Sequence, residues 1–522
     1  MTKNSSKSKF SSLKDTVEGF KHKILFPFLF VLYLILVTYS TDFHELHPEY
    51  AIRVLSVSLF GVMLLYYILN RFIGRKLAGI TALLCSLSFF TFQTQRLLLN
   101  SFILSLETVY MNVPEMEIFV LLIDGLIIGV VFLYLNKKEE MQLSLVTVLN
   151  IFFAILVAIN VINLGYLALN DVYSGSYENE LDLEVNDSGD NPSIYFIVPD
   201  KYTNLEVVEN QFRYNYTPFV NRLSQEGFSF HKDAYSNYDE SATSLASTLN
   251  MNYLQNMKTG GETSHKDVIN VLEDNKVQEF LRNQGYTYHH IGGTYTEFNR
   301  NADRSYNLYN EYLDGRFYLN RYENKLVRKT PLRSLGKTNT LSYTSAKKFD
   351  KISEISEKNG KKFVFAHIMS PHSPHVLAKE VEEVEHLDRD NHSMKETYNQ
   401  SVKAVNVKLE DTVNDILDNE ENVMIIIQGD EGPTLPSDDL KDPSSLKRRH
   451  GILFAHYTPD ISREKFENQI NPVNTFRIIF NHEFGTDLDM IDGRTFHTRE
   501  GEEMEYLERN VSKFLDETKT VN

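Results

Sequence analysis

Long apolar stretches dominate the first third of the chain. Each approaches the roughly 20 residues that a helix needs to cross the hydrocarbon core of a bilayer. The third of these stretches, Leu77–Phe92, is followed closely by Gln93, Gln95 and Arg96, so the alternative for this stretch is a re-entrant or interfacial helix. We predict about five transmembrane helices within residues 24–169. The runs are Ile24–Ser40, Ala51–Ile73, Leu77–Phe92, Ile118–Leu135 and Leu143–Leu169.

Basic residues between these runs predict how the chain is oriented. Short segments rich in Lys and Arg stay on the cytoplasmic side. The tail 1–23 is rich in Lys, whereas the segment 42–50 holds acidic residues and neither Lys nor Arg. We expect a cytoplasmic N-terminus, no cleaved signal peptide and an extracytoplasmic C-terminal domain. The other basic residues in this pattern are Arg71, Arg75, Lys76, Lys137 and Lys138.

Charge and cysteine content exclude several classes of function. The formal net charge of −17 argues against nucleic acid as a partner, because phosphate binding needs a basic face. Cys85 is the only cysteine and lies inside an apolar run. The external part therefore has no disulfide and no thiol for catalysis or metal binding, and its core must stabilise it.

The pattern after the apolar runs is that of an α/β domain. Residues 170–191 are acidic and polar without periodicity, which predicts a linker. From 192 to 498, short apolar runs alternate with helical patterns, as in a sheet of parallel strands with crossover helices. We expect an exposed helical tail at 499–522. The predicted strands are Ile194–Val198, Tyr286–Ile291, Phe363–Ile368, Val423–Ile427 and Ile452–Tyr457.

Polar residues follow three of these strands. They are Asp200, His372 in Ser-Pro-His-Ser-Pro-His, and Asp430 with Glu431 behind it. Open α/β sheets bind ligands at the carboxyl ends of their strands. An Asp after a buried strand often only caps a turn, but three such positions together indicate a site.

Ser241 lies at the start of an amphipathic helical run. The free amides of a helix N-terminus favour an anionic group, so Ser241 is a candidate nucleophile that would face a phosphate or sulfate. The alternative is that Ser241 only caps the helix.

These motifs together resemble the membrane-bound sulfatase-like proteins of the alkaline phosphatase superfamily. Lipoteichoic acid synthases and phosphoethanolamine transferases belong to the same superfamily and have a similar membrane anchor. The resemblance implies an alkaline-phosphatase-like α/β/α domain with one or two divalent cations. It makes Asp200 and Asp430 metal ligands, Ser241 a metal-binding nucleophile and His372 a substrate contact. The motifs lie at 194–200, 234–238, 244–251, 365–368, 425–430 and 472–481.

The chain departs from the family pattern at several points. Asp430-Glu431-Gly432 stands where the family has Asp-His-Gly, and Lys201 follows Asp200 where Gly is common. Ser replaces Thr as nucleophile, and the external part has no Cys to form the formylglycine of true sulfatases. With Glu431 as a ligand, the donors are mainly oxygen, which favours Mn, Mg or Ca over Zn. His450 and His456 flank the last predicted strand and are interpreted as ordinary edge residues, although either could supply the missing imidazole.

The leading hypothesis is metal-dependent transfer or hydrolysis of a phosphate-linked group on a cell-surface lipid or glycan, through a covalent Ser241 intermediate. The alternative is an inactive membrane protein that binds such molecules, in which the Lys201 ammonium pairs with Asp200 and takes the place of the cation. The stretch Arg316–Lys337 is basic within an acidic chain and is predicted to be a solvated insert, or else to hold anionic headgroups.

Overall fold

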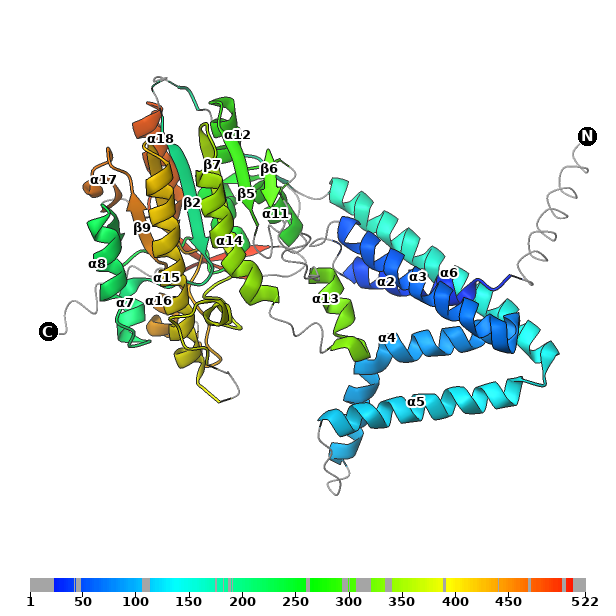
Figure 1. Ribbon diagram of the computed structural model, residues 1–522. Helices are drawn as coiled ribbons and strands as arrows, with labels where there is room; N and C mark the ends of the chain where they lie inside the picture. The colour runs from blue at the N-terminus through cyan, green and yellow to red at the C-terminus, as the bar shows by residue number, and fades with distance from the viewer. Residues whose placement is uncertain are drawn as a thin grey trace, which may run out of the picture. The chain divides into compact units, whose positions relative to one another are not determined.

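The computed structural model divides the chain into two units, Met1–Tyr173 with Phe317–Thr338, and Ser174–Arg316 with Asn339–Asn522 (Figure 1). The residues described are 23–41, 43, 48–105, 113–173, 176–181, 183–185, 189, 191–259, 263–292, 299, 301–306, 321–333, 340–387, 391–439, 441–467, 471–499 and 504–509.

The first unit consists of apolar helices. Within its described residues, four helices are long and apolar enough to cross a membrane, and a shorter apolar one, α2, has 16 residues. Phe72 and Leu133 are 83% and 72% exposed, which suits a surface in contact with lipid. The third predicted run lies within α4, whose 31 residues suffice for a span. The helices are α2 (Phe26–Thr41), α3 (Pro48–Ile73), α4 (Arg75–Ser105), α5 (Val113–Leu135) and α6 (Glu139–Tyr173).

A segment predicted as part of the external domain belongs to this first unit instead. The segment Phe317–Thr338 contains helix α13 (Arg321–Val327), which packs against the membrane helices. The Tyr322 hydroxyl donates to the Ile35 carbonyl at 2.8 Å, and Glu323 pairs with Arg53. The predicted external domain 192–498 is therefore interrupted by this segment. The prediction that this segment is a solvated insert is wrong for α13. A seven-residue helix is too short to show the period that would reveal its apolar face.

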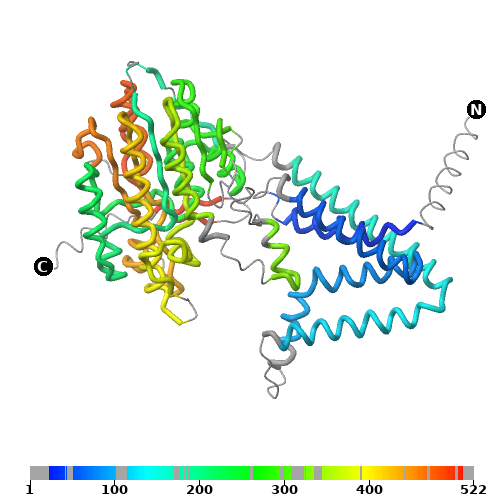
Figure 2. Tube along the Cα trace, in the orientation of Figure 1, coloured from blue at the N-terminus to red at the C-terminus, as the bar shows by residue number. Residues whose placement is uncertain are grey.

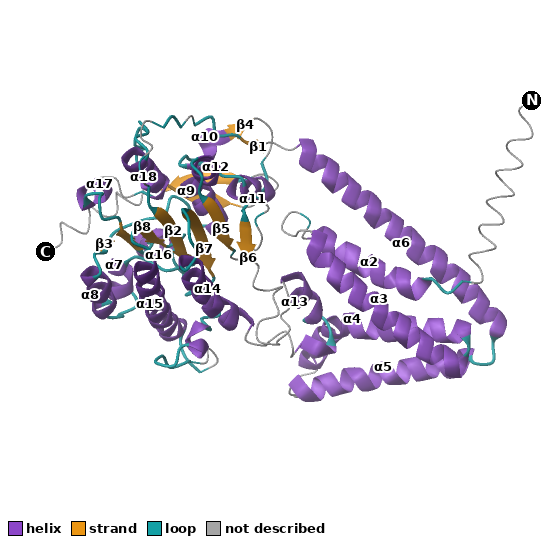
Figure 3. Ribbon diagram, turned by 45° about the horizontal axis from the view of Figure 1, so that its top comes forward, coloured by secondary structure: helices purple, strands orange, loops and turns teal. Residues whose placement is uncertain are grey.

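A seven-stranded sheet organises the described residues of the second unit. Its order is β3-β9-β8-β2-β7-β5-β6, with β2 at the centre (Figure 3). Strands far apart in the sequence become neighbours, as β2 and β7 do in the trace of Figure 2. The strands are β2 (Ser193–Pro199), β3 (Ser229–His231), β5 (Thr287–Ile291), β6 (Arg304–Tyr306), β7 (Lys362–Ile368), β8 (Val423–Gln428) and β9 (Phe454–Tyr457).

Helices cover both faces of this sheet, so its central strands are buried on both sides. All residues of β2, β7 and β8 are buried, which explains their continuous apolar sequences. One face packs against α7 (Leu205–Asn210), α8 (Thr217–Gln225), α14 (Thr340–Ser356) and α15 (Met394–Asn419). The other packs against α9 (Ser241–Asn250), α10 (Leu254–Met257), α11 (His265–Glu273), α12 (Lys276–Asn283) and α18 (Thr475–Glu483). The α/β/α architecture is confirmed.

Strand direction differs from the prediction at one edge. β9 is antiparallel to both β8 and β3, whereas a parallel sheet was expected. The connection from β8 to β9 contains α16 (Pro443–His450), and because the two strands are antiparallel the chain re-enters the sheet at the end where β8 left it. The short strands β3 and β6 were not predicted, because three residues show no alternation.

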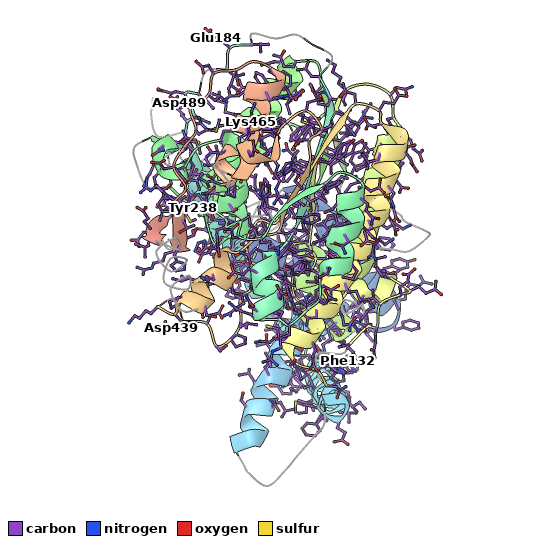
Figure 4. All side chains as sticks on the ribbon, turned by 90° about the vertical axis from the view of Figure 1, so that its left-hand side faces the viewer. Phe132, Glu184, Tyr238, Asp439, Lys465 and Asp489 are labelled. Atoms are coloured by element: carbon purple, nitrogen blue, oxygen red, sulfur yellow. The ribbon has the colours of Figure 1, made fainter. Side chains whose placement is uncertain are left out.

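Two polar segments also differ from the prediction. The linker 170–191 begins inside α6 and contains β1 (Ser176–Tyr177), which pairs with β4 (Lys258–Thr259). The predicted helical tail at 499–522 is wrong where it is described, because β10 (Thr495–Arg499) and β11 (Glu505–Arg509) form a hairpin. Tyr238, labelled in Figure 4, stacks on Phe496 with ring centroids 5.3 Å apart. That aromatic contact favours a strand over a helix for the residues of β10, which include Phe496.

Three buried histidines should make the second unit sensitive to acid. Burial lowers the pKa of His290 and of His456 to about 3, and that of His450 to about 4. Between these values and the ordinary pKa near 6.5, the unfolded chain binds more protons than the folded one. Stability therefore falls as the pH drops through this window, by up to about 1.4 kcal/mol per pH unit for each histidine.

We expect the full-length protein in detergent to unfold at a lower temperature at pH 5 than at pH 7.5. His456→Gln removes one of the protonations, so its unfolding temperature should fall less over the same range. The exposed His392 provides the matched control, and His392→Gln should keep the wild-type slope. Identical slopes for wild type and His456→Gln would contradict the account.

Candidate metal centre

Alternation along the strands places three ligand-type side chains on one face of the sheet. Asp200, directly after β2, and Asp430, two residues after β8, have the same parity as the residues that pack against α9. His367 belongs to β7, where it pairs in register with Val198. The backbone N–H of Asp200 donates to the carbonyl of Ile368 at 2.9 Å and fixes the end of β2 beside β7.

Asp200, His367 and Asp430 form a buried cluster. One ligand atom from each lies within 4.8 Å of the others, and His367 Nε2 is 3.3 Å from Asp430 Oδ2 and 3.7 Å from Asp200 Oδ2. Within the described residues, Asp200 Oδ1, Asp430 Oδ2 and both ring nitrogens of His367 are buried without a hydrogen bond. Such atoms are costly to bury unless an ion satisfies them. The donor set therefore fits one divalent cation.

The two carboxylates perturb each other. Burial, and then the charge of Asp430, raises the pKa of Asp200 well above its ordinary value. Burial acts against ionisation of Asp430 too, but the adjacent His367 and the backbone N–H of Lys201 outweigh it and lower the pKa of Asp430 to about 2. Two buried carboxylates with pKa values driven apart would share a proton unless a cation lies between them.

Ser241 is the first residue of α9, and its hydroxyl points at this centre. Ser241 Oγ donates to Glu431 Oε1 at 3.2 Å. The N-cap position is held by Glu240, so the alternative that Ser241 only caps its helix is wrong. One turn later, Ser244 Oγ donates to the Asp430 carbonyl at 2.7 Å. That bond ties α9 to the strand end that carries Asp430 and Glu431.

Lys201 and Glu431 form a buried ion pair beside the cluster. Lys201 Nζ lies 2.7 Å from Glu431 Oε1, while the Lys201 backbone N–H donates to Asp430 Oδ1 at 3.0 Å. Burial would lower the pKa of Lys201, but Glu431 and then Asp200 outweigh it, so the pKa is raised. Burial raises the pKa of Glu431 despite this partner. The ammonium is thus paired with Glu431, and not with Asp200 as the inactive alternative supposed.

The backbone around Asp430 requires glycine. A Cβ on Gly432 would lie 1.7 Å from the carbonyl oxygen of Arg448, and one on Gly429 would lie 2.6 Å from that of Tyr202. These close approaches let the strand end pass between α16 and the loop after β2. The Gly-Asp-Glu-Gly sequence therefore positions its two acids rigidly.

His372 lies on a neighbouring cavity. The cavity has a volume of about 220 Å³, and its walls include Lys201, His372, Tyr398 and Pro433. His372 Nδ1 is 2.5 Å from the Ser373 carbonyl, so that nitrogen carries the proton. Burial, and then the charge of Lys201, lowers the pKa of His372. A neutral ring in this tautomer presents a lone pair at Nε2, which suits a base better than an acid.

The imidazole of the cluster comes from His367, and neither of the two histidines that flank the last strand supplies it. His450 Nδ1 is 3.5 Å from Ser236 Oγ, and His456 Nε2 is 3.1 Å from His231 Nε2. Neither belongs to the metal cluster found among the described residues. His367 had been noted in a motif without a role. Its signal was a polar residue within an apolar strand, with the same parity as Phe363 and Phe365.

A family model described as Sulfatase matches residues 193–481. No curated protein matches the chain. The periplasmic domain of EcEptC from Escherichia coli is 11% identical and covers 64% of this chain and 96% of its own, with a TM-score of 0.40. The integral membrane phosphoethanolamine transferase EptA from Neisseria meningitidis is 11% identical and covers 86% and 94%, also with a TM-score of 0.40.

Proposed function

Because the chain belongs to the sulfatase family, we propose that it is a metal-dependent enzyme that transfers or hydrolyses a phosphate-linked group on a cell-surface lipid or glycan. One observation carries this proposal. The helix-start hydroxyl of Ser241 donates to Glu431, the residue next to Asp430 of the buried cluster, whose inward atoms lack hydrogen bonds within the described residues. This is the arrangement that nucleophilic attack on an anionic ester requires.

A divalent cation at the cluster would lower the pKa of the Ser241 hydroxyl and neutralise charge on the phosphate. Asp200, His367 and Asp430 would hold it, and Ser241 and Glu431 remain further predicted ligands. Oxygen donors form most of this set, so Mn, Mg or Ca suits it better than Zn.

The chain's own residues carry the covalent steps. Ser241 Oγ attacks phosphorus and its proton passes to Glu431 Oε1 at 3.2 Å, while the bond from phosphorus to the leaving oxygen breaks and that oxygen takes a proton from solvent. A water or a second hydroxyl then attacks the phosphoserine and loses its proton to a base, the bond from phosphorus to Ser241 Oγ breaks, and Glu431 returns its proton to the serine. His372, expected to contact the substrate, has a tautomer that favours accepting the proton of the second nucleophile.

The first unit indicates where the substrate comes from. Its long apolar helices make this a membrane protein. With the basic tail 1–23 in the cytoplasm, the domain with Ser241 would be outside, away from ATP. The donor would then be a membrane lipid or a surface glycan. The second candidate function, binding without turnover, is favoured by the Lys201–Glu431 pair, because an ammonium already occupies part of the site.

A headgroup-release assay tests the proposal. Full-length protein in mixed micelles is incubated with headgroup-labelled phosphatidylglycerol or phosphatidylethanolamine, before and after treatment with EDTA. We expect release with the native protein, loss to background after EDTA, and recovery on adding Mn²⁺ or Mg²⁺. p-Nitrophenyl sulfate should not react, because the second unit contains no Cys from which formylglycine could form.

The outcomes separate the two candidate functions. Protein that contains a divalent ion by elemental mass spectrometry but turns over neither these donors nor bis-p-nitrophenyl phosphate supports the binding function. If the protein takes up no divalent ion at all, the proposed enzymatic function is contradicted.

A further inference from the structure

A cavity of about 510 Å³ lies within the first unit, and no step of the proposed function uses it. Its volume is in the range of ligand sites. One face of α3 forms a wall, because the lining residues recur at helical spacing from Arg53 to Leu65. α4 contributes Phe89 and Phe90, and the segment with α13 contributes Leu326. Most of the lining side chains are apolar, so the cavity suits a hydrocarbon ligand.

The length of the cavity matches half of a bilayer. Arg53 and Leu65 are twelve residues apart, which is about 18 Å along a helix. One leaflet contributes about 15 Å to the hydrocarbon core. An apolar cavity does not hold ordered water, and its walls lose dispersion contacts when nothing fills it. A lipid acyl chain along α3 would restore those contacts.

One end of the cavity is polar and is closed by the segment that contains α13. Arg53 and Glu323, which form an ion pair, both belong to the wall. The backbone N–H of Gln93 donates to the Lys329 carbonyl at 3.0 Å and fixes the same segment to α4. The segment is therefore held by both helices that form the rest of the cavity.

This segment also carries an excess of positive charge. Residues 321–333 hold five basic side chains and one acidic side chain. Two of the basic residues stand between Val327 and Thr330, which line the cavity. Arg and Lys attract a phosphate and form strong, charge-assisted hydrogen bonds with it. An apolar interior with a cationic rim matches the chain and the phosphate of an anionic phospholipid. The basic residues are Arg321, Lys325, Arg328, Lys329 and Arg333.

We propose that this cavity binds one acyl chain of an anionic phospholipid, whose phosphate lies against the basic segment 321–333. The site is separate from the metal centre, because Asp200, His367 and Asp430 do not line the cavity. Binding there requires no turnover and does not depend on the proposed function. Because α13 forms one wall, a bound chain also stabilises the packing of α13 on the membrane helices.

A single tryptophan can report on the cavity, because the chain contains no Trp. Phe89→Trp places the fluorophore in the cavity wall. Full-length protein in detergent is titrated with phosphatidic acid whose acyl chains are brominated, since bromine quenches Trp fluorescence on contact. We expect quenching that saturates at one lipid per protein. Phosphatidic acid carries no alcohol headgroup, so it is no donor in the headgroup-release assay.

Filling the cavity should prevent this quenching. A Cβ on Gly61 would meet no atom within 4 Å, so Gly61→Leu adds a side chain to the cavity without a clash. We expect Gly61→Leu combined with Phe89→Trp to lose the saturable quenching. Gly125 in α5 is equally open and does not line the cavity, so Gly125→Leu should retain it. Phe152→Trp, exposed on α6, should be quenched gradually without saturation.

The rim is tested by changing the ligand and the basic segment. Brominated diacylglycerol has the same chains without the phosphate, and it should bind at least about tenfold more weakly, because hydrogen bonds to a charged group are lost. Arg328→Gln combined with Lys329→Gln should weaken the binding of phosphatidic acid. Saturable quenching that persists in Gly61→Leu, equal affinity for the two lipids, or quenching of Phe89→Trp without saturation overturns the proposed site. If Phe89→Trp does not fold, Phe90→Trp takes its place in the same titration.

Discussion

Ser241→Ala is expected to abolish the covalent intermediate and to lower headgroup release by at least about 10⁴-fold, as loss of a nucleophile does in other enzymes. The physical reason is that Ser241 supplies the attacking oxygen, and its hydroxyl already donates to Glu431 Oε1 at 3.2 Å. Stability should change by only about 1 kcal/mol, because one hydrogen bond is lost. Intact mass spectrometry of the acid-quenched reaction should show a headgroup phosphate on the wild type and none on Ser241→Ala.

The same helix provides a matched control. Ser247 is fully buried in α9, and its hydroxyl donates to the Asn252 carbonyl at 2.8 Å. Ser247→Ala therefore removes a serine of the same helix without touching the centre, and it should retain the adduct. Ser241→Thr keeps the hydroxyl and should retain measurable release. An adduct of unchanged yield on Ser241→Ala would exclude Ser241 as nucleophile.

The sequence predicted the parts of the fold that local patterns determine. Apolar runs longer than a soluble core needs revealed the membrane helices, and continuous apolar runs revealed β2, β7 and β8. Asp200 and Asp430 could be found because each comes within two residues of the end of such a run, where open α/β sheets bind ligands. The hairpin of β10 and β11 was missed because its glutamates suggested an exposed helix, while the contact of Phe496 with Tyr238 is visible only in three dimensions.

The remaining features depend on register and packing, which one sequence does not show. His367 reaches the centre because it pairs with Val198, and that pairing is a property of the sheet. The packing of α13 on the membrane helices includes the Arg53–Glu323 pair, between residues 270 positions apart. In the same way, the inactive alternative paired Lys201 with Asp200, its neighbour in sequence. The end of β8 brings Glu431 closer to the ammonium.

Asp430→Asn is expected to weaken divalent metal binding by at least about 10²-fold, which is as large as the effect of removing supporting groups in other metal sites. Asp430 is fully buried, and its Oδ2 faces His367 while Oδ1 accepts the N–H groups of Lys201 and Glu431. An amide can accept the two N–H groups but cannot supply the charge that holds a cation. Headgroup release should fall with the bound metal.

The effect of Asp430→Asn on stability should change sign with the metal. In EDTA, the variant should be at least as stable as the wild type, because it removes the charge that helps to raise the pKa of Asp200. With Mn²⁺ at 100 times the wild-type Kd, the wild type should gain about 2.7 kcal/mol and the variant almost nothing. Thermal unfolding across a Mn²⁺ titration measures both limits. Asp460→Asn removes an exposed carboxylate of the same domain and should follow the wild type. If Mn²⁺ stabilised Asp430→Asn and the wild type equally, the ion would have to bind elsewhere. An ion held by Asp200, His367 and Asp430 must bind more weakly when the buried carboxylate of Asp430 loses its charge.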